Sequence, residues 1–76
     1  MPRAKDYIFN KGDRVKVVST HLWMPERSGI IKQIENRIGN RFLVKFDVDE
    51  LGMWHDEDSE PVLRLGESDL IFIGTA

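Results

Sequence analysis

The chain has 76 residues, a formal net charge of −2 at pH 7, 41% hydrophobic residues and 32% charged residues. A chain of this length supports one domain with a single small hydrophobic core. It contains no cysteine, which excludes disulfides and thiolate zinc sites, and no apolar run is long enough to cross a bilayer. Its first ten residues lack the apolar stretch of a signal peptide, so the sequence favours a cytoplasmic protein.

The charges are unevenly distributed along the chain. The first 45 residues hold ten of the eleven bases and four acids, whereas the remaining 31 residues hold one base and nine acids. Such a chain can present separate surfaces of opposite potential, one for anions and one for basic partners. Alternatively, the two halves fold against each other and neutralise each other. The sequence leaves both interpretations open.

Five short segments have the pattern of β-strands. Residues 14–17 and 41–46 alternate with a period of two, and residues 30–35 are rich in β-branched side chains. Residues 62–65 and 69–73 are short apolar runs bounded by turn residues. No segment has a convincing helical pattern. The sequence therefore predicts five strands.

The alternation within residues 41–46 predicts which side of that strand is buried. Phe42, Val44 and Phe46 share one face, and this aromatic face is expected to contribute to the core. The other face carries Arg41, Leu43 and Lys45 and is expected to be the opposite, outer face.

Proline and glycine are confined to the connections between the expected strands, which is typical of a small barrel. The long loop after the first strand and a one-turn connection at residues 66–68 favour an SH3-like barrel over an OB-fold. We therefore predict an all-β protein, a small five-stranded SH3-like barrel spanning residues 11–76. Residues 1–10 are expected to form an N-terminal extension.

The order of four segments, KGDRVKV, SGIIKQI, FLVKFD and VLRLGESDL, resembles the SH3-like barrels of the electron-transport accessory superfamily. This superfamily includes the C-terminal domain of the nitrile hydratase β subunit, the small accessory subunit of photosystem I and the variable subunit of ferredoxin-thioredoxin reductase. The nearest pieces are those of the nitrile hydratase β domain, including the acidic segment that follows Lys45-Phe46-Asp47. The resemblance implies the barrel scaffold and a habit of docking onto partner proteins.

The resemblance does not extend to hydratase activity. His21 and Pro25 have the His-x-x-x-Pro spacing of the nitrile hydratase β domain. Two residues after the histidine, that family has an arginine that helps to build the active site, and this chain has Trp23. The metal-bearing α subunit is a separate protein. The similarity therefore implies an accessory role without the family's reaction.

The segment DVDELGMWHDED, residues 47–58, has part of the pattern of a calcium-binding loop. Asp47, Asp49 and Gly52 stand where an EF-hand needs two acids and a glycine. Leu51 cannot act as the ligand required at the fifth position, and Asp58 replaces the usual bidentate glutamate. The preceding residues read as a strand, whereas an EF-hand loop follows a helix. The pattern therefore favours an acidic loop between strands, without a bound metal.

Catalysis and transition-metal binding have little support in the sequence. His21 and His55 are far apart and lack the close spacing of paired histidine ligands. The serines lack a nucleophile elbow, and carboxylates in a solvated loop do not readily gain the raised pKa of a general acid. We therefore expect a non-enzymatic protein with no cofactor and no catalytic residues.

Protein docking is the function that the sequence favours. Large apolar residues and acids in the connections are suited to an interface with a partner protein. The alternative for the tryptophans is that they cap the ends of the barrel as part of its core. The candidate protein-binding residues are Trp23, Met24, Met53, Trp54, Asp56, Glu57 and Asp58.

Nucleic-acid binding is the alternative function, as in KOW and Tudor-like barrels. Bases on the first three strands could form a basic face that contacts phosphates. The candidate residues are Arg14, Lys16, Lys32, Arg41 and Lys45. The isoelectric point near 5.6 weighs against this function. The identity of a protein partner, and the choice between monomer and homodimer, stay open.

Overall fold

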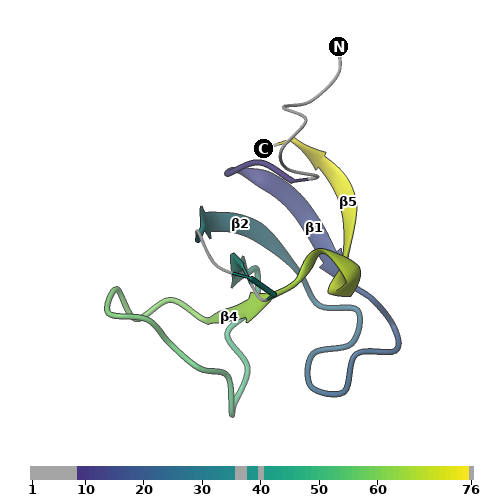
Figure 1. Ribbon diagram of the computed structural model, residues 1–76. Coiled ribbons are helices and arrows are strands. Elements are labelled where there is room, and N and C mark those ends of the chain that lie inside the picture. The colour runs from purple at the N-terminus through teal and green to yellow at the C-terminus, as the bar shows by residue number, and fades with distance from the viewer. Residues whose placement is uncertain (1–8, 36–37, 40, 76) are drawn as a thin grey trace.

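The computed structural model describes residues 9–35, 38–39 and 41–75. They form one five-stranded antiparallel sheet with the strand order β4-β3-β2-β1-β5 (Figure 1). A single turn of 3-10 helix precedes the last strand. The elements are β1 (Asp13–Val17), β2 (Ser28–Ile34), β3 (Phe42–Phe46), β4 (Val62–Leu65), η1 (Glu67–Asp69) and β5 (Leu70–Thr75).

The predicted fold class is confirmed: the protein is all-β, with five strands in a small barrel-like fold. Each strand lies within two residues of its predicted bounds, and the one-turn connection predicted near residues 66–68 is η1. Over the described ranges, no helix is long and apolar enough to cross a membrane.

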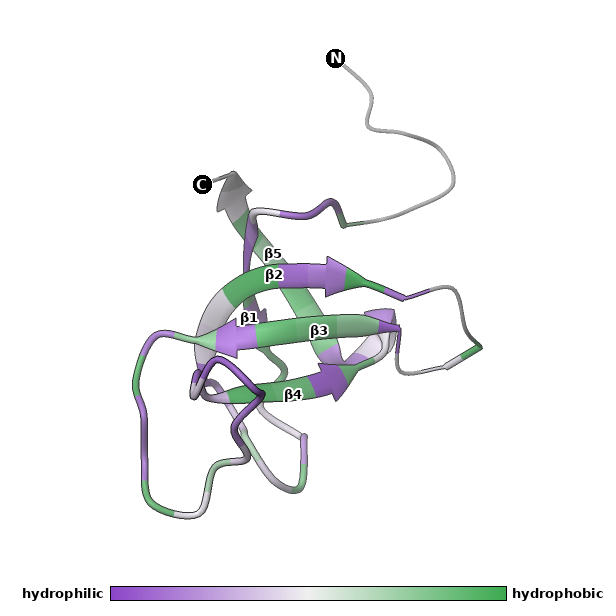
Figure 2. Ribbon diagram, turned by 90° about the vertical axis from the view of Figure 1, so that its left-hand side faces the viewer, coloured by the Kyte–Doolittle hydropathy of each residue, from purple (hydrophilic) through white to green (hydrophobic). Residues whose placement is uncertain are grey.

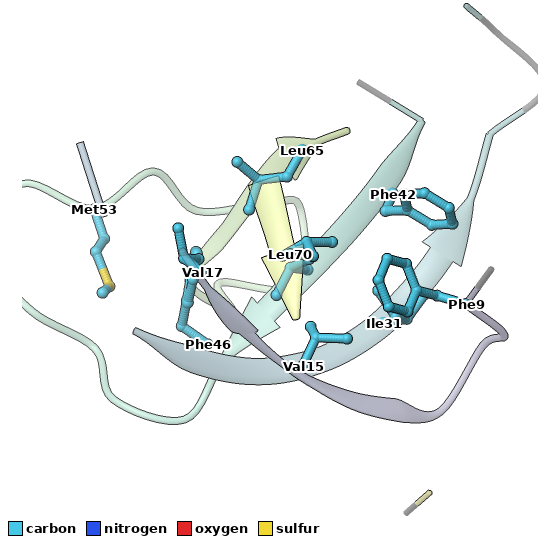
Figure 3. Packing of buried hydrophobic residues seen from close by; sticks show 10 residues of the cluster. Phe9, Val15, Val17, Ile31, Phe42, Phe46, Met53, Leu65 and Leu70 are labelled. Carbon is cyan, nitrogen blue, oxygen red and sulfur yellow. The ribbon is translucent and has the colours of Figure 1, made fainter. Parts of the chain in front are cut away.

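The core gathers side chains from all five strands (Figure 3). Phe42, Val44 and Phe46 are each at most 2% exposed, which confirms the predicted inward face of β3. Val15 of β1 and Ile31 of β2 are fully buried in the same core cluster. Alternation with a period of two therefore located the core strand correctly.

Two residues are more buried than the sequence indicated. Phe9, which the sequence assigned to the N-terminal extension, is 3% exposed, and its ring packs edge-on against Phe42 with the centroids 5.4 Å apart. Leu43, expected on the outer face of β3, is only 7% exposed. Leu43 is paired with Gln33 and Arg64, whose long side chains flank it and can cover apolar surface. The rest of the predicted extension, residues 1–8, lies outside the described residues.

Gly29 allows three strands to approach closely. It is paired with Val15 of β1 on one side and with Phe46 of β3 on the other. A Cβ atom at this position would overlap the carbonyl oxygen of Lys45. Because glycine lacks that atom, the backbone of β2 can lie close to the backbone of β3 at this point.

Two long loops leave the sheet at the same end. The β1–β2 loop comprises residues 18–27 and the β3–β4 loop comprises residues 47–61. Both project below the sheet in Figure 1, and Figure 2 shows the same arrangement from the side. The fold thus brings together two segments that are some thirty residues apart in the chain.

The buried position of Phe46 predicts a large effect of truncation. Phe46→Ala should lower the free energy of unfolding by about 3–5 kcal/mol, because it removes apolar contacts and leaves a cavity. Urea denaturation followed by circular dichroism measures this loss. Val48→Ala is the control, since Val48 lies two residues further along and is exposed, so it should change stability by less than about 0.5 kcal/mol. Equal effects of the two substitutions would contradict the observed core.

Candidate functional site

Asp56 organises the second half of the β3–β4 loop. Its Oδ1 atom accepts hydrogen bonds from the backbone N–H groups of Asp58 and Glu60, each at 3.0 Å. The Asp56 N–H donates to the Glu60 carbonyl at 3.1 Å, and Ser59 adopts a left-handed backbone conformation with φ of 63°. A short polar side chain that bonds nearby backbone in this way fixes a turn. Residues 56–60 are therefore an ordered turn, where the sequence indicated only a solvated acidic loop.

The turn is attached to the sheet by lysines of β2 and β3. The Lys32 ammonium donates to Asp56, to Glu60 at 2.6 Å and to Asp58 at 3.1 Å. The Lys45 ammonium lies 3.3 Å from a Glu60 oxygen. We refer to Asp56, Asp58 and Glu60 as the carboxylate cluster. One cation thus joins three acids that would otherwise repel one another.

These contacts alter the acid–base properties of the cluster. Hydrogen bonding from Lys32 holds the pKa of Asp56 below its usual value. The pKa of Glu60 is also lowered, first by Lys32 and then by Lys45. The same hydrogen bonds, led by the one to Asp56, raise the pKa of Lys32. These contacts therefore favour the charged forms of Asp56, Glu60 and Lys32.

The acids of the calcium-like pattern do not form one ligand set. Asp47 contacts Arg14, Asp49 contacts His55 at 2.7 Å, and Asp58 belongs to the carboxylate cluster. Among the described residues, the cluster is the only group of at least three potential ligand side chains close enough to share a metal ion. The Lys32 ammonium already donates to all three of its acids. The chain itself thus supplies a cation where an ion would bind.

The predicted basic face is largely neutralised by acids. Arg14 lies 2.5 Å from Asp47, and Lys16 lies 4.0 Å from Glu26. Lys32 and Lys45 contact the carboxylate cluster as described above. Arg41, just before β3, is half-buried. Of the two interpretations of the uneven charge, the structure supports mutual attraction between the halves of the chain.

An ion pair links the two long loops. Arg27, at the end of the β1–β2 loop, binds Glu50 of the β3–β4 loop through two contacts of 2.5 and 2.7 Å. Such a two-point contact restricts both orientation and distance. Next to it, the Met53 side chain turns inward, so this candidate protein-binding residue belongs to the core. The first half of the β3–β4 loop is therefore held from both sides.

His21 shapes the tip of the β1–β2 loop. Its Nδ1 atom accepts hydrogen bonds from the backbone N–H groups of Trp23 and Met24, both at 3.1 Å. The Met24 side chain is half-buried and packs against the core. The Trp23 side chain points away from the core and is 77% exposed. Further along the loop, Glu26 has a left-handed backbone conformation with φ of 63°, which is uncommon for a residue with a side chain.

A cleft of about 880 Å³ lies where the two loops meet the sheet. Both tryptophans line it, and Trp54 is 73% exposed. The interpretation that the tryptophans cap the barrel as core is therefore wrong. We call this feature the tryptophan cleft, and its apolar walls include Met24, Leu43, Val62 and Leu63.

The cleft also contains charged groups from several elements. Asp56 and Glu57 come from the β3–β4 loop, Arg64 from β4 and Asp69 from η1. Candidate residues Trp23, Met24, Trp54, Asp56 and Glu57 are thus brought together. Asp58 does not line the cleft, and its carboxylate contacts Lys32.

Sequence reasoning missed Leu43, Leu63, Arg64 and Asp69 as residues of the site. Their local pattern identified them only as parts of strands, and Asp69 instead ends η1. Their position in the cleft depends on how β3, β4 and η1 lie relative to the loops. The one signal in the sequence that could have suggested an apolar wall was Leu43, an apolar residue on the face of β3 that was expected to point outward.

Comparison of the chain with family models, with curated proteins and with solved structures gave no match. The resemblance to the electron-transport accessory superfamily therefore remains a prediction.

The ionised carboxylate cluster predicts acid sensitivity. The pKa values of Asp56 and Glu60 are lowered in the folded protein, so the unfolded chain binds more protons in acid. The two acids therefore stabilise the fold above about pH 5, and this effect is lost as the pH falls through their lowered pKa values. Lys32→Met should lower the melting temperature by several degrees at neutral pH. The difference from the unmodified protein should shrink as the pH falls through the lowered pKa values of Asp56 and Glu60, because the two acids then become neutral.

Thermal melts from about pH 7 to about pH 3 provide the measurement. Lys11→Met is the matched control, because Lys11 is exposed and contacts no acid among the described residues. A melting-temperature difference for Lys32→Met that does not change with pH would show that the ion cluster does not stabilise the fold.

Proposed function

We propose that this protein is a non-enzymatic docking module that acts in the cytoplasm and binds a partner protein through the tryptophan cleft. The observation that carries the proposal is the exposure of two tryptophans, Trp23 and Trp54, on one apolar cleft. An indole that is three-quarters exposed contributes little to the core of its own domain. A partner that covered both side chains would remove a large apolar area from water.

The tryptophans are also suited to binding because the fold does not depend on them. The buried core cluster contains neither Trp23 nor Trp54. Tryptophans at interfaces are frequently the residues whose truncation costs about 2 kcal/mol or more of binding free energy. Their side chains have few rotatable bonds, so little conformational entropy is lost when they are covered. The absence of the two tryptophans from the core supports a binding role for them.

The loops that carry the tryptophans are held in place before any partner arrives. Arg27 and Glu50 join the loops, and Lys32 holds the turn beyond Trp54. A surface that is already ordered loses less entropy on binding than a flexible one. The ion pairs therefore favour binding without adding any contact to a partner.

Nucleic-acid binding has less support. Four of the five predicted phosphate-binding bases, namely Arg14, Lys16, Lys32 and Lys45, lie beside acids within the domain. Binding a phosphate would require breaking those ion pairs or competing with them. The tryptophan cleft, with Asp56, Glu57 and Asp69 in its lining, would repel a phosphate backbone.

The proposal predicts that each tryptophan is needed for binding and is dispensable for folding. Trp23→Ala and Trp54→Ala should each change the free energy of unfolding by less than about 0.5 kcal/mol. Each should lower the capture of a partner from a lysate of the source cells about tenfold or more. The comparison uses the tagged full chain, with and without nuclease, and quantifies captured proteins by mass spectrometry.

Ile38→Ser is the matched control. Ile38 is a fully exposed apolar residue on the connection between β2 and β3, so its loss should leave specific capture unchanged. Capture that survives both tryptophan substitutions would overturn the cleft as the docking surface. Capture that disappears with nuclease would reverse the choice between protein and nucleic acid.

A further inference from the structure

The acids that line the tryptophan cleft are only partly neutralised by bases of the same chain. Arg64 donates from Nε to Glu35 at 2.8 Å, and Asp56 is held by Lys32. Glu57 is exposed, and the carboxylate of Asp69 accepts one hydrogen bond, from the backbone N–H of Gly66 at 3.3 Å. Within the described part of the chain, neither Glu57 nor Asp69 has a basic partner. After internal pairing, the cleft therefore retains negative charge.

The β3–β4 loop around the cleft also has a net negative charge. The β3–β4 loop carries seven acids and neither lysine nor arginine. Four bases from the rest of the domain contact this loop, namely Arg14, Arg27, Lys32 and Lys45. The number of acids exceeds the number of bases that contact them, so an approaching cation is attracted and an approaching anion is repelled.

The residues that line the cleft indicate which kind of cationic group would fit it. Met24, Leu43 and Leu63 provide apolar surface, which suits the methylene chain of a long side chain. Indole faces attract cations, and they attract a planar guanidinium in particular, which can stack on the ring. Carboxylates accept its N–H groups in a forked arrangement. An apolar stem with a planar cationic head fits these three kinds of surface.

We propose that the tryptophan cleft recognises an arginine side chain of the partner protein. The guanidinium lies against an indole of Trp23 or Trp54, and Glu57 and Asp69 neutralise its charge. The partner segment is therefore basic, with apolar residues beside the arginine that contact the walls of the cleft. This inference rests on the proposed docking function and specifies what the docking surface selects.

The test uses short peptide libraries that are identical except for one fixed central residue, which is arginine, citrulline or glutamate. Citrulline keeps the shape of arginine and removes its charge. Binding to the full chain is followed by the NMR shifts of the two indole N–H groups. The arginine library should bind about tenfold or more tightly than the citrulline library, and the glutamate library should bind least.

Charge-removing variants then locate the effect. Glu57→Gln and Asp69→Asn, alone and together, should reduce arginine binding towards the citrulline level and leave citrulline binding unchanged. Glu67→Gln is the matched control, because Glu67 is an exposed acid on η1 outside the lining of the cleft. It should leave both affinities unchanged. Asp69→Asn keeps an oxygen for the Gly66 N–H, and thermal melts check that each variant is folded.

The outcomes separate this inference from the function on which it rests. If the arginine and citrulline libraries bind equally, and Trp23→Ala and Trp54→Ala abolish this binding, arginine recognition is overturned. The cleft would still be the docking surface. No indole shift with any library would overturn both. A preference for arginine that persists in the Glu57→Gln, Asp69→Asn double variant would also overturn the proposal, because other groups would then bind the guanidinium.

Discussion

The position of the second half of the β3–β4 loop depends chiefly on one ammonium group, that of Lys32. A sheet of five short strands cannot by itself fix a connection of this length. Lys32 reaches from β2 to three carboxylates that follow one another at alternate positions in the loop. The contacts of Lys32 with Asp56 and Glu60 are partly shielded from water, so these two are stronger than an exposed pair would be. The loop that carries Trp54 thereby becomes part of the folded domain.

The large apolar residues form two groups, one in the core and one around the cleft. One group, centred on β3, packs inside the sheet and excludes water. The other group stands on the loops and on the outer surfaces of β3 and β4, where Trp23 and Trp54 border a cleft. A domain this small has few large side chains to bury. Leaving both tryptophans in water forgoes stability that they could supply as core, which is a common feature of residues retained for binding.

Local patterns predicted the fold well and the site only in part. The inward face of β3 follows from side chains that alternate along six residues, and the strands and turns follow from similarly short stretches. The contact between Lys32 and Asp56 joins residues 24 positions apart, so no local pattern contains it. The exposure of Trp23 depends on how His21 folds the loop tip. Composition favoured neither burial nor exposure, because tryptophan is found in both settings.

The burial of Phe9 and Leu43 has the same explanation. Phe9 precedes the first strand and shows no periodicity, and only the proximity of Phe42 makes it a core residue. Leu43 obeys the alternation of β3, which directs it outward. Its burial arises from neighbours on β2 and β4. Sequence reasoning thus located the residues that the backbone directs inward and missed those that their neighbours cover.

The end of β5 lies on the opposite side of the sheet from the two long loops (Figure 1). Thr75, the last residue of that strand, is paired with Asp13 at the start of β1, whereas the cleft lies beyond the other end of these strands. A surface, a tag or another polypeptide joined to the C-terminal end would therefore stand clear of the tryptophans. The domain can therefore be attached at one end of the sheet while its cleft stays accessible at the other end.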